Sequence, residues 1–174
     1  MFTHRASAWL LLICTFVCSP ALYSQSLGKP IDESQLKDFD LVAGPDGVGF
    51  PTGSGTAIQG KAVFESKCAA CHTLTGEGVS GNTRLVGGSM QSQGEPLRTV
   101  GSFWPHASTL FDFIRRAMPA NAPKSLSNEE VYQATAYVLF LNGVVAEDTV
   151  IDKQALLEIV MPNAAGFVDQ SHLQ

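Results

Sequence analysis

The chain contains 174 residues, a length that suits one domain with terminal extensions rather than two full domains. Apolar residues make up 45 % of the chain and charged residues 16 %, which are ordinary proportions for a globular protein. The formal net charge of −5 would repel a polyphosphate backbone, so nucleic acid is excluded as a partner.

The first 24 residues are predicted to be a secretory signal peptide. Arg5 contributes to a short positive start, and residues 8–22 that follow are almost free of charge. This apolar stretch is too short to span a bilayer comfortably, so we expect cleavage after Ser24; a retained membrane anchor is the alternative. Export to the periplasm is therefore expected.

Residues 25–54 are predicted to form an extended arm. They are rich in Gly, Pro, Asp and Ser, and they end in the run GPDGVGFPTGSG, a composition that favours turns and loops. At most one helical turn is expected within the arm, around residues 32–38. The folded domain is therefore predicted to begin at residue 55.

The first helix of that domain is expected over residues 57–71, capped by Ser54 or Thr56. Gly60 would normally weaken such a helix, but it lies four residues before Phe64 and forms a small-then-aromatic face. A later helix could cross closely at Gly60, through a face that carries Tyr137 and Leu141. The alternative is that Gly60 only frays the start of the helix.

The rest of the domain is predicted to be a long loop followed by helices. The loop covers residues 73–105 and contains seven glycines. A loop of this length is uncommon inside a compact domain, and packing around a large flat cofactor would explain how it is ordered. Three helices follow. The first covers residues 108–118, capped by Ser108 and ended by Pro119. The second covers residues 131–142, opened by a capping box at residues 127–130 and ended by Gly143, and the third covers residues 152–160. No run resembles a strand, so the fold is predicted to be all-α, with a domain over residues 55–145 and a C-terminal extension over residues 146–174 that carries one short helix.

The run Cys68-Ala69-Ala70-Cys71-His72 has the spacing of a covalent haem site. Two thiols separated by two residues on a helical turn can reach the two vinyl groups of one porphyrin. The adjoining His72 then lies beneath the iron as the proximal ligand, and its other ring nitrogen is expected to donate to a backbone carbonyl. We therefore expect one haem c per chain.

Other uses of these cysteines fit the sequence less well. Removal of the signal peptide takes away the other two cysteines, so Cys68 and Cys71 remain without a disulfide framework. A zinc site would need two more ligands, and the remaining histidines, His106 and His172, are far apart in sequence. A thioredoxin-like redox pair would need a βαβ context, which the sequence lacks.

The sixth iron ligand is expected to be Met118. It lies 46 residues after His72, at the end of a predicted helix and directly before Pro119, which frees the backbone to turn. A thioether sulfur at this position favours ferrous iron and raises the reduction potential. The alternatives are Met90, His106, Met161 and an open position.

These features together resemble a class I cytochrome c over residues 55–145: a helix with a G-x-x-x-F pattern, CAACH, a Gly-rich loop, a Met-Pro step and a final capped helix. Residues 101–145 and the arm run GPDGVGFPTGSG are similar to the cytochrome subunits of periplasmic sulfane dehydrogenases and molybdenum sulfite dehydrogenases. The resemblance implies that haem is attached at Cys68 and Cys71 and that its iron is bound by His72 and Met118. The sulfane dehydrogenase subunit usually has two haems, so the single-haem partner of sulfite dehydrogenase is the better match.

The sequence thus predicts an electron-transfer protein rather than an enzyme. The resemblance implies that it accepts single electrons from a periplasmic molybdenum-containing dehydrogenase that oxidises sulfite or another sulfur compound. A downstream cytochrome or a terminal oxidase would then receive them. Two other functions stay open: a free-standing carrier without a dedicated partner, and a catalytic or gas-sensing haem with an open iron position.

Overall fold

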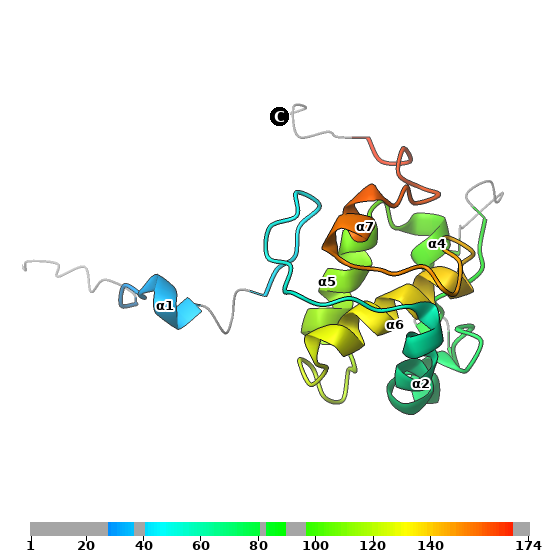
Figure 1. Ribbon diagram of the computed structural model, residues 1–174, viewed down its shortest axis with the longest axis horizontal. Helices are drawn as coiled ribbons and strands as arrows, with labels where there is room; N and C mark the ends of the chain where they lie inside the picture. The colour runs from blue at the N-terminus through cyan, green and yellow to red at the C-terminus, as the bar shows by residue number, and fades with distance from the viewer. Residues whose placement is uncertain (1–27, 37–40, 81–82, 90–96, 169–174) are drawn as a thin grey trace, which may run out of the picture. The chain divides into compact units, whose positions relative to one another are not determined.

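The computed structural model describes residues 28–36, 41–80, 83–89 and 97–168 (Figure 1). The predicted signal peptide therefore lies outside the described residues. The chain divides into two units, Met1–Gln35 and Leu36–Gln174. The helical turn expected near residue 32 is present as α1, Glu33–Leu36. None of the helices in the described ranges is long and apolar enough to cross a membrane.

The second unit is built from helices. Over its described residues it has no strand, only isolated bridges that join Gly55 to Ile151 and His106 to Val160. The prediction of an all-α fold is therefore confirmed. Its helices are α2 (Ala57–Lys67), α3 (Ala69–His72), α4 (Val100–Phe103), α5 (Ala107–Ala117), α6 (Asn128–Leu141) and α7 (Lys153–Glu158).

Helix α6 is the centre of this unit, with α2, α4 and α5 packed against it and α7 packed against α5 (Figure 1). Its side chains are apolar on most sides, as expected for a helix covered by several neighbours. Tyr132 and Leu139 are fully buried, and the ring of Phe111 on α5 lies 4.5 Å from that of Tyr132. The core therefore follows the length of α6.

The close crossing predicted at Gly60 is present. A Cβ atom on Gly60 would lie 1.9 Å from the carbonyl oxygen of Gln133 and 2.9 Å from Cβ of Tyr137, both on α6. One turn further along α2, the ring of Phe64 packs 5.0 Å from that of Tyr137. Glycine is thus required because the two backbones touch, which offsets its low helix propensity.

Three local predictions were wrong in detail. The helix predicted through Cys71 ends at Lys67, and the backbone at Cys68 (φ −119°, ψ −35°) separates α2 from α3. Helix α5 begins two residues earlier than expected, with His106 rather than Ser108 at the N-cap position. The predicted loop contains α4, which the sequence analysis missed although Thr99 and Ser102 form a capping box there.

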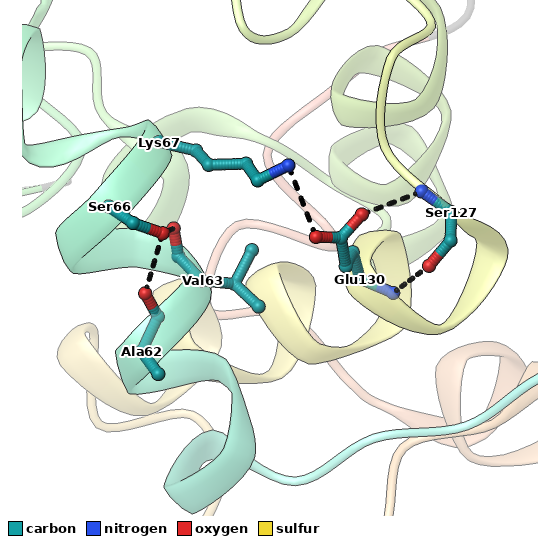
Figure 2. Close-up of polar contacts among 6 residues, drawn as sticks. All are labelled: Ala62, Val63, Ser66, Lys67, Ser127 and Glu130. Atoms are coloured by element: carbon teal, nitrogen blue, oxygen red, sulfur yellow. Dashed lines mark hydrogen bonds and ion pairs between the residues drawn. The ribbon is translucent and has the colours of Figure 1, made fainter.

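The capping box predicted at the start of α6 is confirmed (Figure 2). The Ser127 hydroxyl accepts the Glu130 N–H at 3.2 Å, and the Glu130 carboxylate accepts the Ser127 N–H at 2.8 Å. Glu130 also pairs with Lys67 of α2 at 3.2 Å. The Ser127 N–H and the neighbouring ammonium of Lys67 together hold the pKa of Glu130 below its usual range.

Replacing Ser127 with Ala is expected to lower the free energy of unfolding by about 1 kcal/mol, because the N–H of Glu130 loses its acceptor. Urea unfolding followed by circular dichroism measures this change. Lys67→Ala is a useful comparison, since its exposed ion pair is worth less than about 1 kcal/mol. A larger loss for Lys67→Ala than for Ser127→Ala would contradict this account of the helix start.

The last part of the arm packs against the helices instead of extending away from them. Phe50 stacks on Phe111 of α5, with ring centroids 4.9 Å apart, and the Tyr132 hydroxyl donates to the Pro51 carbonyl at 2.9 Å. The Ala43 N–H donates to Oδ1 of Asp112 on α5 at 2.9 Å. The core is therefore shared between the helical domain and residues that precede it.

Asp112 makes this packing sensitive to acid. Burial raises the pKa of its carboxyl group, but the hydrogen bonds from Arg116 and from the Ala43 N–H outweigh burial and bring the pKa below its ordinary value of 3.8. A lowered pKa in the folded state means that the carboxylate stabilises the fold above pH 3.8. This stabilisation is lost as the pH falls through the lowered folded value.

Asp112→Asn is therefore expected to lower the free energy of unfolding by about 2 kcal/mol at neutral pH, as for hydrogen bonds to a charged group. The difference from the wild type should shrink as the pH falls from 3.8 through the lowered pKa of the folded state, where the wild-type carboxylate becomes protonated too. Urea unfolding at pH 7 and in acid measures both values. A difference that stays constant with pH would show that the charge of Asp112 is not responsible.

Candidate haem site

The last four residues of the CAACH run form the short helix α3, and Cys68 is its N-cap residue. Cys68 is half-buried against the core and Cys71 is exposed, and both are free thiols. Burial raises the pKa of the Cys68 thiol to about 11, with the neighbouring Lys67 acting in the opposite direction. The two cysteines belong to one helical turn, because the Cys71 N–H donates to the Cys68 carbonyl at 3.1 Å.

The imidazole of His72 is fixed by a backbone carbonyl, as the sequence analysis expected. Its Nδ1 atom lies 2.5 Å from the carbonyl oxygen of Thr83. Since a carbonyl only accepts hydrogen bonds, this contact places the proton on Nδ1 and leaves the lone pair of Nε2 available to a metal. The imidazole of His72 therefore has a fixed orientation, with Nε2 free to act as a metal ligand.

Thr83 is held in place by the turn that surrounds it. Its hydroxyl accepts the N–H groups of Val79 and Ser80, at 3.0 and 3.1 Å, and donates to the Ser80 carbonyl at 2.9 Å. The Gly78 N–H donates to the His72 carbonyl at 2.9 Å. At Gly78 (φ +75°), a Cβ atom would lie 2.6 Å from the Thr83 carbonyl carbon, so only glycine allows this approach.

Asn142 is a second support that the sequence analysis missed. Its side-chain amide donates to the Leu85 carbonyl at 3.2 Å, and its side-chain oxygen accepts the Gly101 N–H at 3.2 Å. It therefore ties the loop after His72 to α4 and to the end of α6. An asparagine just before a glycine at a helix end signals only the end of the helix, so no sequence pattern reveals these contacts.

Met118 lies directly after α5, and its N–H donates to the Ile114 carbonyl at 3.1 Å. Its side chain is partly buried against the core. The loop after Met118 leads to α6, where Glu130 pairs with Lys67 beside Cys68. The end of α5 and the CAACH run are thus both linked to the first turn of α6.

The alternative iron ligands occupy other places. His106 is exposed at the N-cap of α5, the opposite end from Met118, and an 11-residue helix separates them by roughly 16 Å. Met161 is 1 % exposed and belongs to the core. Met90 lies outside the described residues. Met118 as the distal ligand therefore stays a prediction.

The residues around CAACH fit a haem group. The chain presents two free thiols on one turn and an imidazole whose Nε2 is available. Beside them, Leu74 and Val79 are 60 % and 68 % exposed, and the Val79 N–H is bonded to the Cys71 carbonyl at 3.1 Å. Such exposed apolar side chains next to metal-binding groups are suited to covering a large apolar ring.

Two comparisons with known proteins agree with this site. The family described as cytochrome c oxidase, cbb3-type, subunit III matches residues 55–138. A chain in the crystal structure of the sulfane dehydrogenase SoxCD from Paracoccus pantotrophus is 34 % identical, with a TM-score of 0.77. The similarity covers 86 % of this chain and 74 % of that one. This chain belongs to the class I cytochrome c family. No curated protein matches it.

Membership in the cytochrome c family confirms the resemblance drawn from the sequence. It implies covalently bound haem c and a role in electron transfer, and the similarity to SoxCD supports a sulfur-oxidation context. In this cytochrome, the matched residues 55–138 include the CAACH run, Met118 and most of α6. They do not include residues 41–54, which nevertheless pack on α5 and α6.

Proposed function

We propose that this cytochrome is a periplasmic carrier of single electrons with one haem c per chain. Cys68 and Cys71 attach the haem through thioether bonds, and His72 binds the iron from the proximal side. The observation that carries the proposal is the fixed imidazole of His72, with Nδ1 bonded to Thr83 and Nε2 available beside two free thiols. Met118 at the end of α5 provides the distal ligand.

A haem c bound here supplies an iron that cycles between the ferric and ferrous states. The chain's own groups decide how easily this cycling occurs. The carbonyl of Thr83 holds the Nδ1–H of His72, which makes Nε2 a better donor and fixes the plane of the ring. Met118 would hold the iron through its thioether, a soft donor that favours the ferrous state.

The proposed electron donor is a periplasmic molybdenum-containing dehydrogenase that oxidises sulfite or another sulfur compound. The similarity to a chain of the sulfane dehydrogenase SoxCD supports this kind of partner. The single C-x-x-C-H motif of this chain supports the sulfite enzyme in particular. A downstream cytochrome or a terminal oxidase is the proposed acceptor, and the protein itself is proposed not to be an enzyme.

The first test is covalent attachment of haem in cells that mature c-type cytochromes. The wild-type protein should keep its haem on a denaturing gel, with one haem per chain by pyridine haemochrome assay. The double variant Cys68→Ser/Cys71→Ser should lose it. A wild-type protein that releases its haem under denaturing conditions would contradict the proposal.

The second test addresses the partner. The ferric protein should be reduced by a purified molybdenum sulfite dehydrogenase when sulfite is added, and a molybdenum enzyme should copurify with the cytochrome from periplasmic extract. A cytochrome that accepts electrons from another donor, but is not reduced by the sulfite dehydrogenase and does not copurify with a molybdenum enzyme, would instead support a free-standing carrier. Omission of sulfite is the control for direct chemical reduction.

A further inference from the structure

A closed loop precedes the helical domain and lies against α5. The loop covers residues 41–51, and its turn is fixed by a bond from the Gly44 N–H to the Val48 carbonyl at 3.0 Å. Its ends meet at Gly49 (φ +83°), where a Cβ atom would lie 1.7 Å from the Val42 carbonyl oxygen. The loop therefore has a defined shape that depends on glycine at that position.

Two charged side chains of α5 hold this loop through its backbone. The carboxylate of Asp112 accepts the N–H of Ala43 at 2.9 Å, and the buried Ala43 side chain is 3 % exposed. The guanidinium of Arg115 donates from Nη1 to the carbonyls of Leu41 at 3.1 Å and Gly49 at 2.7 Å. One arginine thus bonds both ends of the loop at once.

These contacts lie in the part of α5 that leads to Met118. Arg115 lies in the last turn of α5, three residues before Met118, which directly follows the helix. The Met118 N–H completes the last turn by donating to Ile114 at 3.1 Å. Helix ends fray unless something holds them, and the loop holds this one from outside.

The other end of the loop is attached to α6. The Tyr132 hydroxyl donates to the Pro51 carbonyl at 2.9 Å, and the Tyr132 ring also packs on Phe111 of α5. The loop therefore connects the end of α5 to the central helix. Displacing the loop would free the last turn of α5 from that support.

We propose that the loop of residues 41–51, which Arg115 binds through two hydrogen bonds, positions Met118. The loop thereby sets the fraction of molecules in which the Met118 thioether is bound to the iron. This inference rests on the proposed function, because it takes Met118 as the distal ligand. Arg115 acts here as a positioning residue, since the bonds of its guanidinium go to the loop. Without its two bonds to the loop, the last turn of α5 loosens and the thioether leaves the iron more often.

The test compares Arg115→Gln with Lys61→Gln in the haem-loaded protein. Lys61 is the control, since its exposed ammonium pairs only weakly with Glu65 of the same helix α2, at 3.9 Å, and it has no bond to the loop. Two readouts report on the iron: the near-infrared sulfur-to-iron band of the ferric protein and the rate at which the ferrous protein binds carbon monoxide. Thermal unfolding of each variant is measured beside them.

Arg115→Gln should weaken the band and raise the carbon monoxide binding rate about tenfold, because this rate is proportional to the fraction of molecules with an open iron position. Lys61→Gln should change the rate less than about twofold, because it removes only an exposed ion pair. Arg115→Lys, which keeps the charge and can still bond one carbonyl, should be intermediate and keeps the test valid if Arg115→Gln does not fold.

An Arg115→Gln protein that unfolds more easily but keeps the wild-type band and rate would overturn the proposal, because Arg115 would then support only the fold. So would equal changes in the two glutamine variants. Failure of the Met118 assignment is recognised separately, since the wild-type protein itself would then lack the sulfur-to-iron band.

Discussion

Replacing Met118 with Ala should abolish the near-infrared sulfur-to-iron band and open the iron to external ligands. In the wild type, the thioether is expected to be off the iron in about 0.1–10 % of molecules, as for a minor conformational state. Carbon monoxide binding to the ferrous variant should therefore be about 10- to 1000-fold faster. The reduction potential should fall as well, because the soft sulfur donor that favours ferrous iron is gone.

Met161→Leu is the matched control for this experiment. Met161 is 1 % exposed in the core, so a similar apolar side chain there should leave the band in place and cost less than about 1.5 kcal/mol. Stopped-flow mixing with carbon monoxide and near-infrared absorption measure both variants. If the band persists in Met118→Ala, another methionine, Met90 or Met161, must be the sulfur ligand.

Replacing Gly60 with Ala is expected to be the most destabilising single methyl addition in α2. On propensity alone, Ala should stabilise this helix by about 1 kcal/mol relative to Gly. The added Cβ, however, would lie 1.9 Å from the Gln133 carbonyl oxygen, a backbone atom that moves only if α6 moves. We expect a net loss of about 2–3 kcal/mol in the free energy of unfolding.

The control for Gly60→Ala is Gly143→Ala. Gly143 (φ +68°) has no atom within 4 Å of the Cβ position, so its substitution carries only the backbone cost, about 1 kcal/mol. Urea unfolding of both variants separates a clash between helices from a local backbone effect. A Gly60→Ala protein as stable as the wild type would contradict the close crossing of α2 and α6.

The sequence identified most helix starts because their signals are local. The capping box of Ser127 and Glu130 and the N-cap at Asp152 both join residues three apart, so their spacing can be read directly from the chain. The start of α5 was misplaced because Ser108, a good capping residue, is buried behind the actual N-cap at His106. Tertiary packing decided that boundary.

For the site itself, the sequence alone determined the haem motif, the candidate distal methionine and the crossing at Gly60. Each depends on residue type and short spacing. Only the tertiary structure decided that the Thr83 carbonyl fixes His72 and that Asn142 connects the loop after His72 to α4. The same holds for Arg115, which donates to two carbonyls that lie 66 and 74 residues before it in the sequence. These contacts are made to backbone carbonyls and N–H groups, which nearly every residue has, so no pattern of side chains in the sequence predicts them.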